Sequence, residues 1–297
     1  MREQDVRLLM DASPEGRVDV GWQTGVIRQR AKTVKAGRHL YLDAYPIWDT
    51  AMTRQAEDAA RKVKAKDPEK RRRANARQAQ RRLVWIVNAN FGEGDILLTC
   101  TYPDERQPKS ADEAHRDARN MIARLRRMYK QLGVELKYVY VTETTTSAAR
   151  GTRYHHHMII TGGVSRETVE AMWYDRHGGF CNSRRAQKRP EGLTGWAKYI
   201  TKQVGGVDKG VATKRTWCRS RNMVIPQPTT ADKKISRRRV ERIAAEMDQD
   251  RPETRAILER IYPGYELVEC EVRTSDWVTG AYIAAVMVRR EESTCRH

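Results

Sequence analysis

The middle of the chain carries apolar residues at two regular spacings, one typical of strands and one typical of a helix. Residues 95–102 and 134–143 are short apolar runs bounded by turn residues, which predicts a strand at each. Between them, at 118–132, apolar residues recur every three or four positions, as they do on one face of a helix. Ser110 and Glu113 have the spacing of a capping box, so we expect this helix to begin directly after Ser110.

These spacings continue beyond a loop rich in Ser, Thr and Gly at 144–152. Residues 153–161 are predicted to form a strand, close enough in sequence to 134–143 to pair with it as a hairpin. Helices are expected at 165–174 and 194–202. The order strand, helix, strand, strand, helix, helix is typical of an α+β fold. Its helices would pack on one face of an antiparallel sheet and leave the other face open for a substrate.

The two flanks of this central region have weaker patterns. Residues 50–89 are rich in Ala, Arg, Lys and Gln, a helix-forming mixture that Asp67-Pro68 is expected to break into two helices. Elsewhere we predict loops at 175–191 and 207–228, strands at 18–22, 39–48, 265–273 and 281–289, and helices at 231–248 and 252–261. We therefore expect an N-terminal region with basic helices (1–94), a central domain (95–228) and a C-terminal segment (229–297) that can pack on the same domain.

The net charge of +19 adds a polyanionic partner to this picture. The 57 Lys and Arg residues outnumber 38 Asp and Glu, and the surplus is concentrated in two windows. Residues 61–82 carry 11 basic and two acidic side chains, and residues 146–221 carry 15 basic and five acidic ones. Nucleic acid is the simplest partner for such surfaces. Anionic lipid is a weaker choice, because no apolar face accompanies the run at 61–82.

The cysteines indicate a reducing compartment. The chain has five, which form no Cys-x-x-Cys pair: Cys100, Cys181, Cys218, Cys270 and Cys295. Their odd number and wide spacing argue against a disulfide framework or a structural zinc cluster. No apolar run follows Met1, and no stretch is long enough to span a bilayer. We expect a soluble cytoplasmic protein with no membrane partner.

Three consecutive histidines lie in the predicted strand at 153–161. Because side chains alternate along a strand, His155 and His157 share one face, whereas His156 points to the other. Two imidazoles on one face can hold a divalent metal, and Glu143 could join them across the hairpin. Mg²⁺ or Mn²⁺ suits such mixed ligands, as do Zn²⁺ and Ni²⁺ in a test tube. The alternative is a solvated strand end with an exposed carboxylate, and the sequence leaves open which two histidines bind.

Tyr199 and Lys202 are three residues apart in the predicted helix at 194–202, so they share a face of it. A tyrosyl oxygen can attack phosphorus when a metal polarises the phosphate and a cation lies nearby. Lys202 could supply that cation. By themselves, however, the two residues favour an ordinary interfacial tyrosine beside a surface lysine.

Three short motifs occur in a fixed order along the central region. They are Leu97-Leu98-Thr99-Cys100-Thr101-Tyr102, His155-His156-His157 and Tyr199-Ile200-Thr201-Lys202. In this order and spacing they resemble the motifs of the HUH endonuclease superfamily. The likeness is greatest to the rolling-circle replication initiators, the replication-associated proteins of bacterial phages, plasmids and integrative elements. Segments 75–91 and 217–222 add to the likeness, which covers about residues 70–228. One departure is His156, since the middle residue of the second motif is usually apolar.

The resemblance implies that His155, His157 and Glu143 bind Mg²⁺ or Mn²⁺, that Tyr199 is the nucleophile and that Lys202 assists it. The implied reaction is a nicking and rejoining of single-stranded or origin DNA through a 5′-phosphotyrosine. Such a reaction starts rolling-circle replication in the cytoplasm of a bacterial host. A host polymerase and a host helicase are implied partners, because the chain has no Gly-x-x-x-x-Gly-Lys-Ser/Thr loop of its own.

The basic windows also supply candidates for contacts with DNA phosphates. These are Arg71, Arg72, Arg73, Arg153, Arg184, Arg185, Lys198, Arg219 and Arg221. Other functions remain compatible with the sequence: a relaxase or single-strand transposase with the same chemistry, or a nucleic-acid-binding regulator without catalysis. A metalloprotease is disfavoured, because no His-Glu-x-x-His motif occurs.

Overall fold

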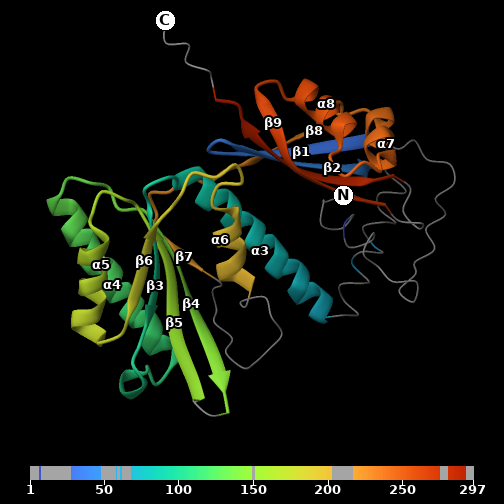
Figure 1. Ribbon diagram of the computed structural model, residues 1–297. Helices are drawn as coiled ribbons and strands as arrows, with labels where there is room; N and C mark the ends of the chain where they lie inside the picture. The colour runs from blue at the N-terminus through green and yellow to red at the C-terminus, as the bar shows by residue number, and fades with distance from the viewer. Residues whose placement is uncertain are drawn as a thin grey trace, which may run out of the picture. The chain divides into compact units, whose positions relative to one another are not determined.

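The computed structural model describes residues 28–47, 68–148, 151–202, 217–274 and 280–291, together with positions 7, 58 and 61. The chain forms two compact units, one of Met1–Asn75 with Pro226–His297 and one of Ala76–Ile225. In each unit the described strands form a five-stranded antiparallel sheet (Figure 1). The predicted α+β class, an antiparallel sheet with packed helices, is confirmed.

The sheet of the unit Ala76–Ile225 has the strand order β6-β3-β5-β4-β7. Strand β5 is central, and its apolar end, Met158-Ile159-Ile160, is fully buried, as expected for a strand covered on both faces. Strand β6 lies inside the predicted loop 175–191, whose polar residues show no strand alternation. The bounds are β3 Ile96–Thr101, β4 Tyr138–Ser147, β5 Gly151–Ile160, β6 Cys181–Arg185 and β7 Cys218–Arg219.

Helices α4 Ala111–Gln131 and α5 Arg166–His177 pack on one face of this sheet. The predicted capping box is present, since the Ser110 hydroxyl accepts a hydrogen bond of 3.2 Å from the Glu113 amide. The core between helices and sheet includes Met121, Leu125 and Trp173, none of which is exposed. Burying such a side chain contributes roughly 1.5–3 kcal/mol. This layer fixes which face of β5 is core and which is available for a site.

The opposite face of the sheet is not left open. Helices α3 Pro68–Asn90 and α6 Thr194–Lys202 lie on that side, away from α4 and α5 (Figure 1). Helix α3 begins at Pro68, which confirms the predicted break, because proline is favoured in the first turn and disfavoured inside a helix. The other predicted helix, before Pro68, lies almost entirely outside the described residues.

The unit of Met1–Asn75 with Pro226–His297 contains a sheet of order β8-β1-β2-β10-β9. Helices α7 Arg237–Ala245 and α8 Pro252–Ile261 pack against it around a separate core. The predicted strands at 39–48, 265–273 and 281–289 are present, whereas 18–22 lies outside the described residues. The bounds are β1 Arg28–Ala36, β2 His39–Ile47, β8 Pro228–Ala231, β9 Tyr265–Arg273 and β10 Tyr282–Arg289.

Two details of this unit differ from the sequence predictions. Residues 228–231 form β8, and α7 begins only after Ser236, whose hydroxyl accepts a hydrogen bond from the Arg239 amide. The segment 229–297 was expected to pack on the central domain. It pairs instead with the N-terminal strands, since β10 lies beside β2 in the register Ile283↔Ala44. Strand pairing between distant segments leaves no local signal in a sequence.

Candidate active site

The register of three adjacent strands brings two histidines and a carboxylate together. Glu143 of β4 is directly opposite His155 of β5, and His157 lies opposite Val141 one step further along. Directly opposed residues share a face of the sheet, as do residues two apart. The Nε2 atoms of His155 and His157 each lie 2.9 Å from Oε2 of Glu143. The hairpin predicted from the sequence therefore places Glu143 beside the histidine pair.

Burial and hydrogen bonding set the charge of Glu143. Its side chain is largely removed from solvent, with the whole residue 7% exposed. Burial alone would raise its pKa, but hydrogen bonds from His155 and His157 outweigh this and lower the pKa to about 2. The carboxylate is therefore ionised at every pH at which the fold is studied. An anion between two imidazole nitrogens is a donor set that binds divalent cations.

Thr99 of β3 orients the more buried of the two imidazoles. Its hydroxyl lies 3.1 Å from Nδ1 of His157, directly opposite in the strand register. A hydrogen bond at Nδ1 fixes the ring and leaves Nε2 facing Glu143. The first sequence motif thus contributes a side chain that supports a ligand, a role that the sequence analysis did not assign to Thr99.

His156 lies on the other face of β5 and is completely buried. Its Nε2 is 2.8 Å from the hydroxyl of Tyr102, and its Nδ1 is 3.0 Å from that of Thr142. Burial lowers the pKa of His156 to about 3, so the ring is neutral. Its edge meets the face of Trp173, with ring centroids 5.5 Å apart. Among the three histidines, the geometry therefore groups His155 and His157 with Glu143.

These residues fit a divalent metal. One ligand atom from each of Glu143, His155 and His157 lies within 4.8 Å of the other two. Two imidazoles and one carboxylate form a mixed nitrogen and oxygen set that leaves coordination positions for water or a phosphate oxygen. The ligands come from strands that are fixed by the sheet, so their spacing does not depend on a loop.

Tyr199 reaches this group from helix α6. The rings of Tyr199 and His157 meet edge to face, with centroids 5.5 Å apart and an interplanar angle of 81°. Tyr199 is 63% exposed, whereas its neighbours Ala197 and Ile200 are buried and hold the helix in place. The predicted nucleophile thus lies beside the predicted metal ligands and is accessible to a substrate. Lys202 ends the helix, and its side chain lies outside the described part of the structure.

Polar side chains of α3 hold α6 in this position. Asn88 is buried; it donates to the Thr194 hydroxyl at 2.9 Å and accepts from the Leu193 amide at 2.8 Å. Gln80 donates to the Thr201 hydroxyl at 2.8 Å and to the Lys198 carbonyl at 3.1 Å. Sequence reasoning noted the likeness of 75–91 to a family but assigned neither residue a role.

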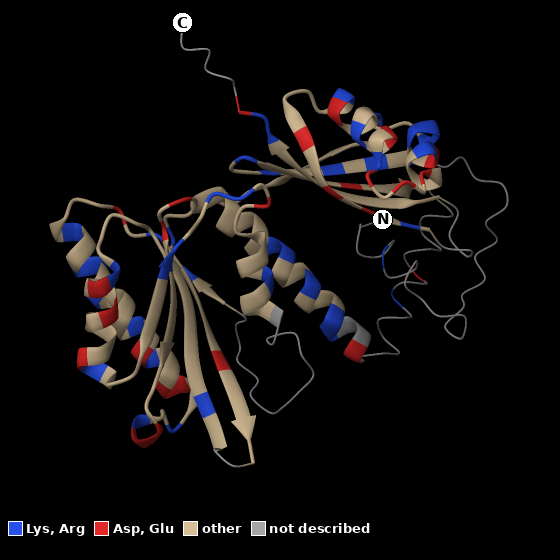
Figure 2. Cartoon of the chain, in the orientation of Figure 1, with Lys and Arg blue, Asp and Glu red and all other residues tan. Residues whose placement is uncertain are grey.

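The predicted DNA contacts fall into two groups. Figure 2 shows Lys and Arg spaced along α3, and Arg72, Arg73, Lys198 and Arg184 are exposed. Lys198 immediately precedes Tyr199, and Arg73 forms an ion pair with Glu69. The side chain of Arg71 lies outside the described residues.

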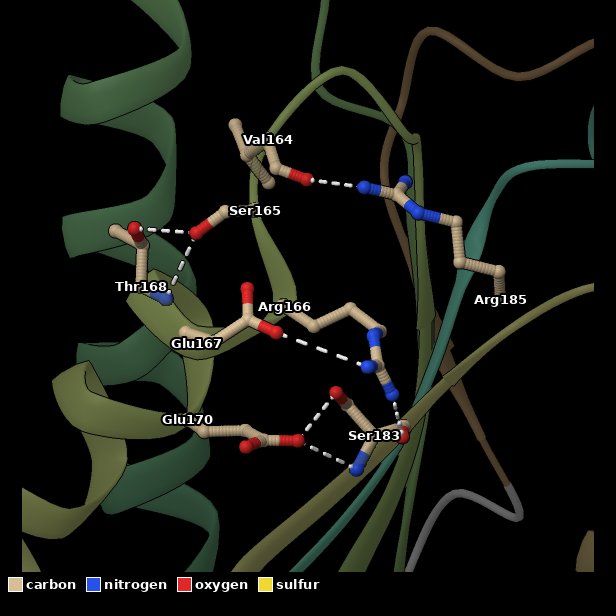
Figure 3. Close-up of polar contacts among 8 residues, drawn as sticks. All are labelled: Val164, Ser165, Arg166, Glu167, Thr168, Glu170, Ser183 and Arg185. Atoms are coloured by element: carbon tan, nitrogen blue, oxygen red, sulfur yellow. Dashed lines mark hydrogen bonds and ion pairs between the residues drawn. The ribbon is translucent and has the colours of Figure 1, made fainter.

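Other predicted contacts are occupied by the protein itself. Arg185 donates to the carbonyls of Val164 and Gly94 at 2.8 and 2.9 Å, which ties β6 to the loop before α5 (Figure 3). Arg153 forms an ion pair with Asp104. Arg219 is half-buried and Arg221 is exposed at the end of β7. Arg185 therefore has a structural role that its place in a basic run did not indicate.

The arrangement defines a protein with a candidate divalent-metal centre on an antiparallel sheet and a tyrosine beside it. Residues 95–204 match the model of the replication-associated protein ORF2 family, and this segment includes the three candidate ligands and Tyr199. The match supports a replication-associated protein. Comparison with curated proteins and with solved structures gives no match. In the part of the chain that is described, no helix is long and apolar enough to cross a membrane.

Proposed function

We propose that this protein is a site-specific endonuclease and strand-joining enzyme that initiates rolling-circle replication through a tyrosine–DNA link. The observation that carries the proposal is the contact between Tyr199 and His157, which joins an exposed phenol to the cluster of Glu143, His155 and His157. The family match over residues 95–204 supports a role in replication. The net charge of +19 is suited to a DNA substrate.

Glu143, His155 and His157 would hold Mg²⁺ or Mn²⁺ at the face of the sheet. Such an ion, when bound, polarises the oxygens of the scissile phosphate and offsets the charge that develops on them. The protein's part is to keep the ligands fixed before the substrate arrives. Thr99 fixes the His157 ring, and the ionised Glu143 supplies negative charge for the cation.

The hydroxyl of Tyr199 is the nucleophile of the proposed reaction. Its oxygen forms a bond to phosphorus while the bond between phosphorus and the 3′ oxygen breaks, and the phenolic proton passes to solvent. The departing 3′ oxygen takes up a proton and becomes a free hydroxyl. Because Tyr199 is exposed, both proton transfers can use bulk water. Lys198 and Lys202, on the same helix, are candidates to attract the phosphate.

The covalent link preserves the phosphodiester bond energy, so rejoining needs no ATP. A 3′ hydroxyl attacks the phosphotyrosine, re-forms the DNA bond and releases Tyr199 by the reverse of the first step. In the meantime the first 3′ hydroxyl would prime a host polymerase, with a host helicase opening the duplex. Relaxases and single-strand transposases use the same step, so the nicked sequence would distinguish these roles.

The proposal is tested by incubating the protein with single-stranded origin DNA and Mn²⁺ and looking for a covalent adduct on a denaturing gel. We expect an adduct with the wild type and none with Tyr199→Phe. Tyr174→Phe is the matched control, because Tyr174 is also exposed but lies on α5. An adduct that persists in Tyr199→Phe would refute the assigned nucleophile. Tight DNA binding without any adduct would favour a regulator that lacks catalysis.

A further inference from the structure

A second basic concavity lies beside helix α4, near the β4 and β7 edge of the sheet. Two adjoining cavities of about 620 and 580 Å³ share four lining residues: Arg126, Tyr138, Arg219 and Arg221. Each volume is in the range of roughly 300–1,000 Å³ that is usual for ligand sites. Tyr138 and Tyr140 alternate with Val139 and Val141, so these tyrosines lie on the sheet face opposite Glu143. We call this concavity the α4 groove.

Four arginines gather at the α4 groove. Arg119 and Arg126 are seven residues apart on α4 and therefore share one of its faces. Arg219 and Arg221 come from β7 and the residues after it. Within the described part of the chain, none of the four forms an ion pair with a carboxylate. Asp112, in the first turn of α4, is the one acid among the described lining residues. The groove is thus strongly cationic and its charge is mostly uncompensated.

An aromatic surface accompanies these cations. Tyr138 is half-buried and stacks on the buried Tyr140, with ring centroids 6.4 Å apart and an interplanar angle of 26°. Both rings line the groove. Arginines spaced along a groove track a phosphate backbone, and an aromatic face accepts an unstacked base. A duplex keeps its bases stacked, so a ring of this kind favours a single strand.

We propose that the α4 groove binds a segment of single-stranded DNA, distinct from the segment that would lie at Tyr199. The two adjoining cavities give room for neighbouring nucleotides along one strand. Arg119, Arg126, Arg219 and Arg221 contact phosphates, and Tyr138 stacks on a base. The identification of the strand as origin DNA rests on the proposed function. The binding itself needs neither metal nor Tyr199.

The test compares two double variants that remove the same charge from the unit Ala76–Ile225. Arg126→Gln with Arg221→Gln alters the α4 groove. Arg127→Gln with Lys130→Gln is the matched control, because these exposed residues of α4 line neither cavity. Fluorescence anisotropy measures binding of a single strand of about 20 nucleotides, longer than the ~4–16 nucleotides that one site covers. A chelator is present, so no cleavage occurs.

We expect the groove variant to bind the single strand at least tenfold more weakly, and the control to change affinity less than threefold. The dependence of log affinity on log salt should flatten by about 1.4, since each lost phosphate contact contributes about 0.7 on a single strand. Tyr138→Leu should weaken binding further and Tyr138→Phe should not. Equal losses in both double variants, no loss in either, or a preference for duplex over single strand would overturn the proposal. If Tyr199→Phe still formed an adduct, the proposed function would fail and this binding result would stand.

Discussion

Strand β5 presents histidines of the same type to two different surroundings. On one face, His155 and His157 direct nitrogen atoms at the ionised Glu143. On the other face, His156 lies in the core, bonded to hydroxyls of Tyr102 and Thr142. The side chains differ only in which face of the strand they occupy. Alternation along a strand is therefore enough to separate a candidate ligand from a structural residue one position away.

The two faces also differ in what surrounds them. The core face is covered by α4 and α5 through apolar side chains such as Leu125 and Trp173. The metal face has Tyr199, largely exposed, beside His157. A buried histidine on the core face is stable only when neutral and fully hydrogen-bonded, whereas the imidazoles beside Glu143 remain available to a cation. The same residue type thus supports the fold on one face and is available for chemistry on the other.

The largest effect is expected from the metal face. His157→Ala removes one of three candidate ligands, and we expect adduct formation with Mn²⁺ to fall by about 1,000-fold, which corresponds to ~4 kcal/mol. DNA affinity should change little, because the basic residues that would contact phosphates are retained. Adduct yield on a denaturing gel and anisotropy on the same oligonucleotide measure both. A parallel loss of binding and cutting would contradict this assignment.

The next effect is expected from the core face. His156→Ala leaves a cavity beside Trp173 and removes partners of Tyr102 and Thr142, so we expect a stability loss of roughly 2–4 kcal/mol. Calorimetry should show a midpoint lowered by roughly 2–4 °C per kcal/mol for a unit of this size. Below that midpoint, Mn²⁺ affinity measured by titration calorimetry should stay within threefold of wild type. A folded His156→Ala protein that no longer binds Mn²⁺ would show that the two faces are not independent.

This separation of faces was predictable from the sequence because it depends on local patterns. The run from His155 to His157 lies in a strand, and alternation alone puts the outer two on one side. The hairpin with Glu143 followed from a short loop between two strands. Tyr199 required the resemblance to a family, since by itself an exposed tyrosine on a helix has no specific signal.

Other parts of the structure depend on contacts between distant segments, which leave no local pattern. Strand β1 has the sequence Arg-Gln-Arg-Ala-Lys-Thr-Val-Lys-Ala, too polar to predict as a strand until its pairing with β2 and β8 is known. Strand β6 is similar, because it is held by β3 and by α5: the Glu170 carboxylate accepts from the Ser183 amide (Figure 3). The covering of the metal face by α3 and α6 also depends on tertiary contacts, so the predicted open face was too simple.

A smaller effect is expected from the residue that orients His157. Thr99→Val keeps the shape of the side chain but removes the hydroxyl 3.1 Å from Nδ1. Loss of such a supporting hydrogen bond typically lowers metal affinity by about 10–100-fold. Titration calorimetry with Mn²⁺ measures the change, and Thr99→Ser, which keeps the hydroxyl, should restore most of the affinity. If Thr99→Val binds Mn²⁺ as tightly as wild type, the hydroxyl does not support the ligand.

The smallest effect is expected where α3 holds α6 over the metal face. On the core face the helices are held by buried apolar side chains, but here Gln80 contributes two hydrogen bonds to α6 at a partly exposed position. Gln80→Ala should therefore cost about 1 kcal/mol, lowering the rate of adduct formation roughly fivefold by loosening the position of Tyr199. Mn²⁺ affinity should be unchanged, because the ligands lie on the strands. Gln78→Ala, at an exposed position of the same helix, should have no effect on the rate. A drop in Mn²⁺ affinity with Gln80→Ala would mean that α6 also shapes the ligand cluster, and the two layers of the metal face could then not be treated separately.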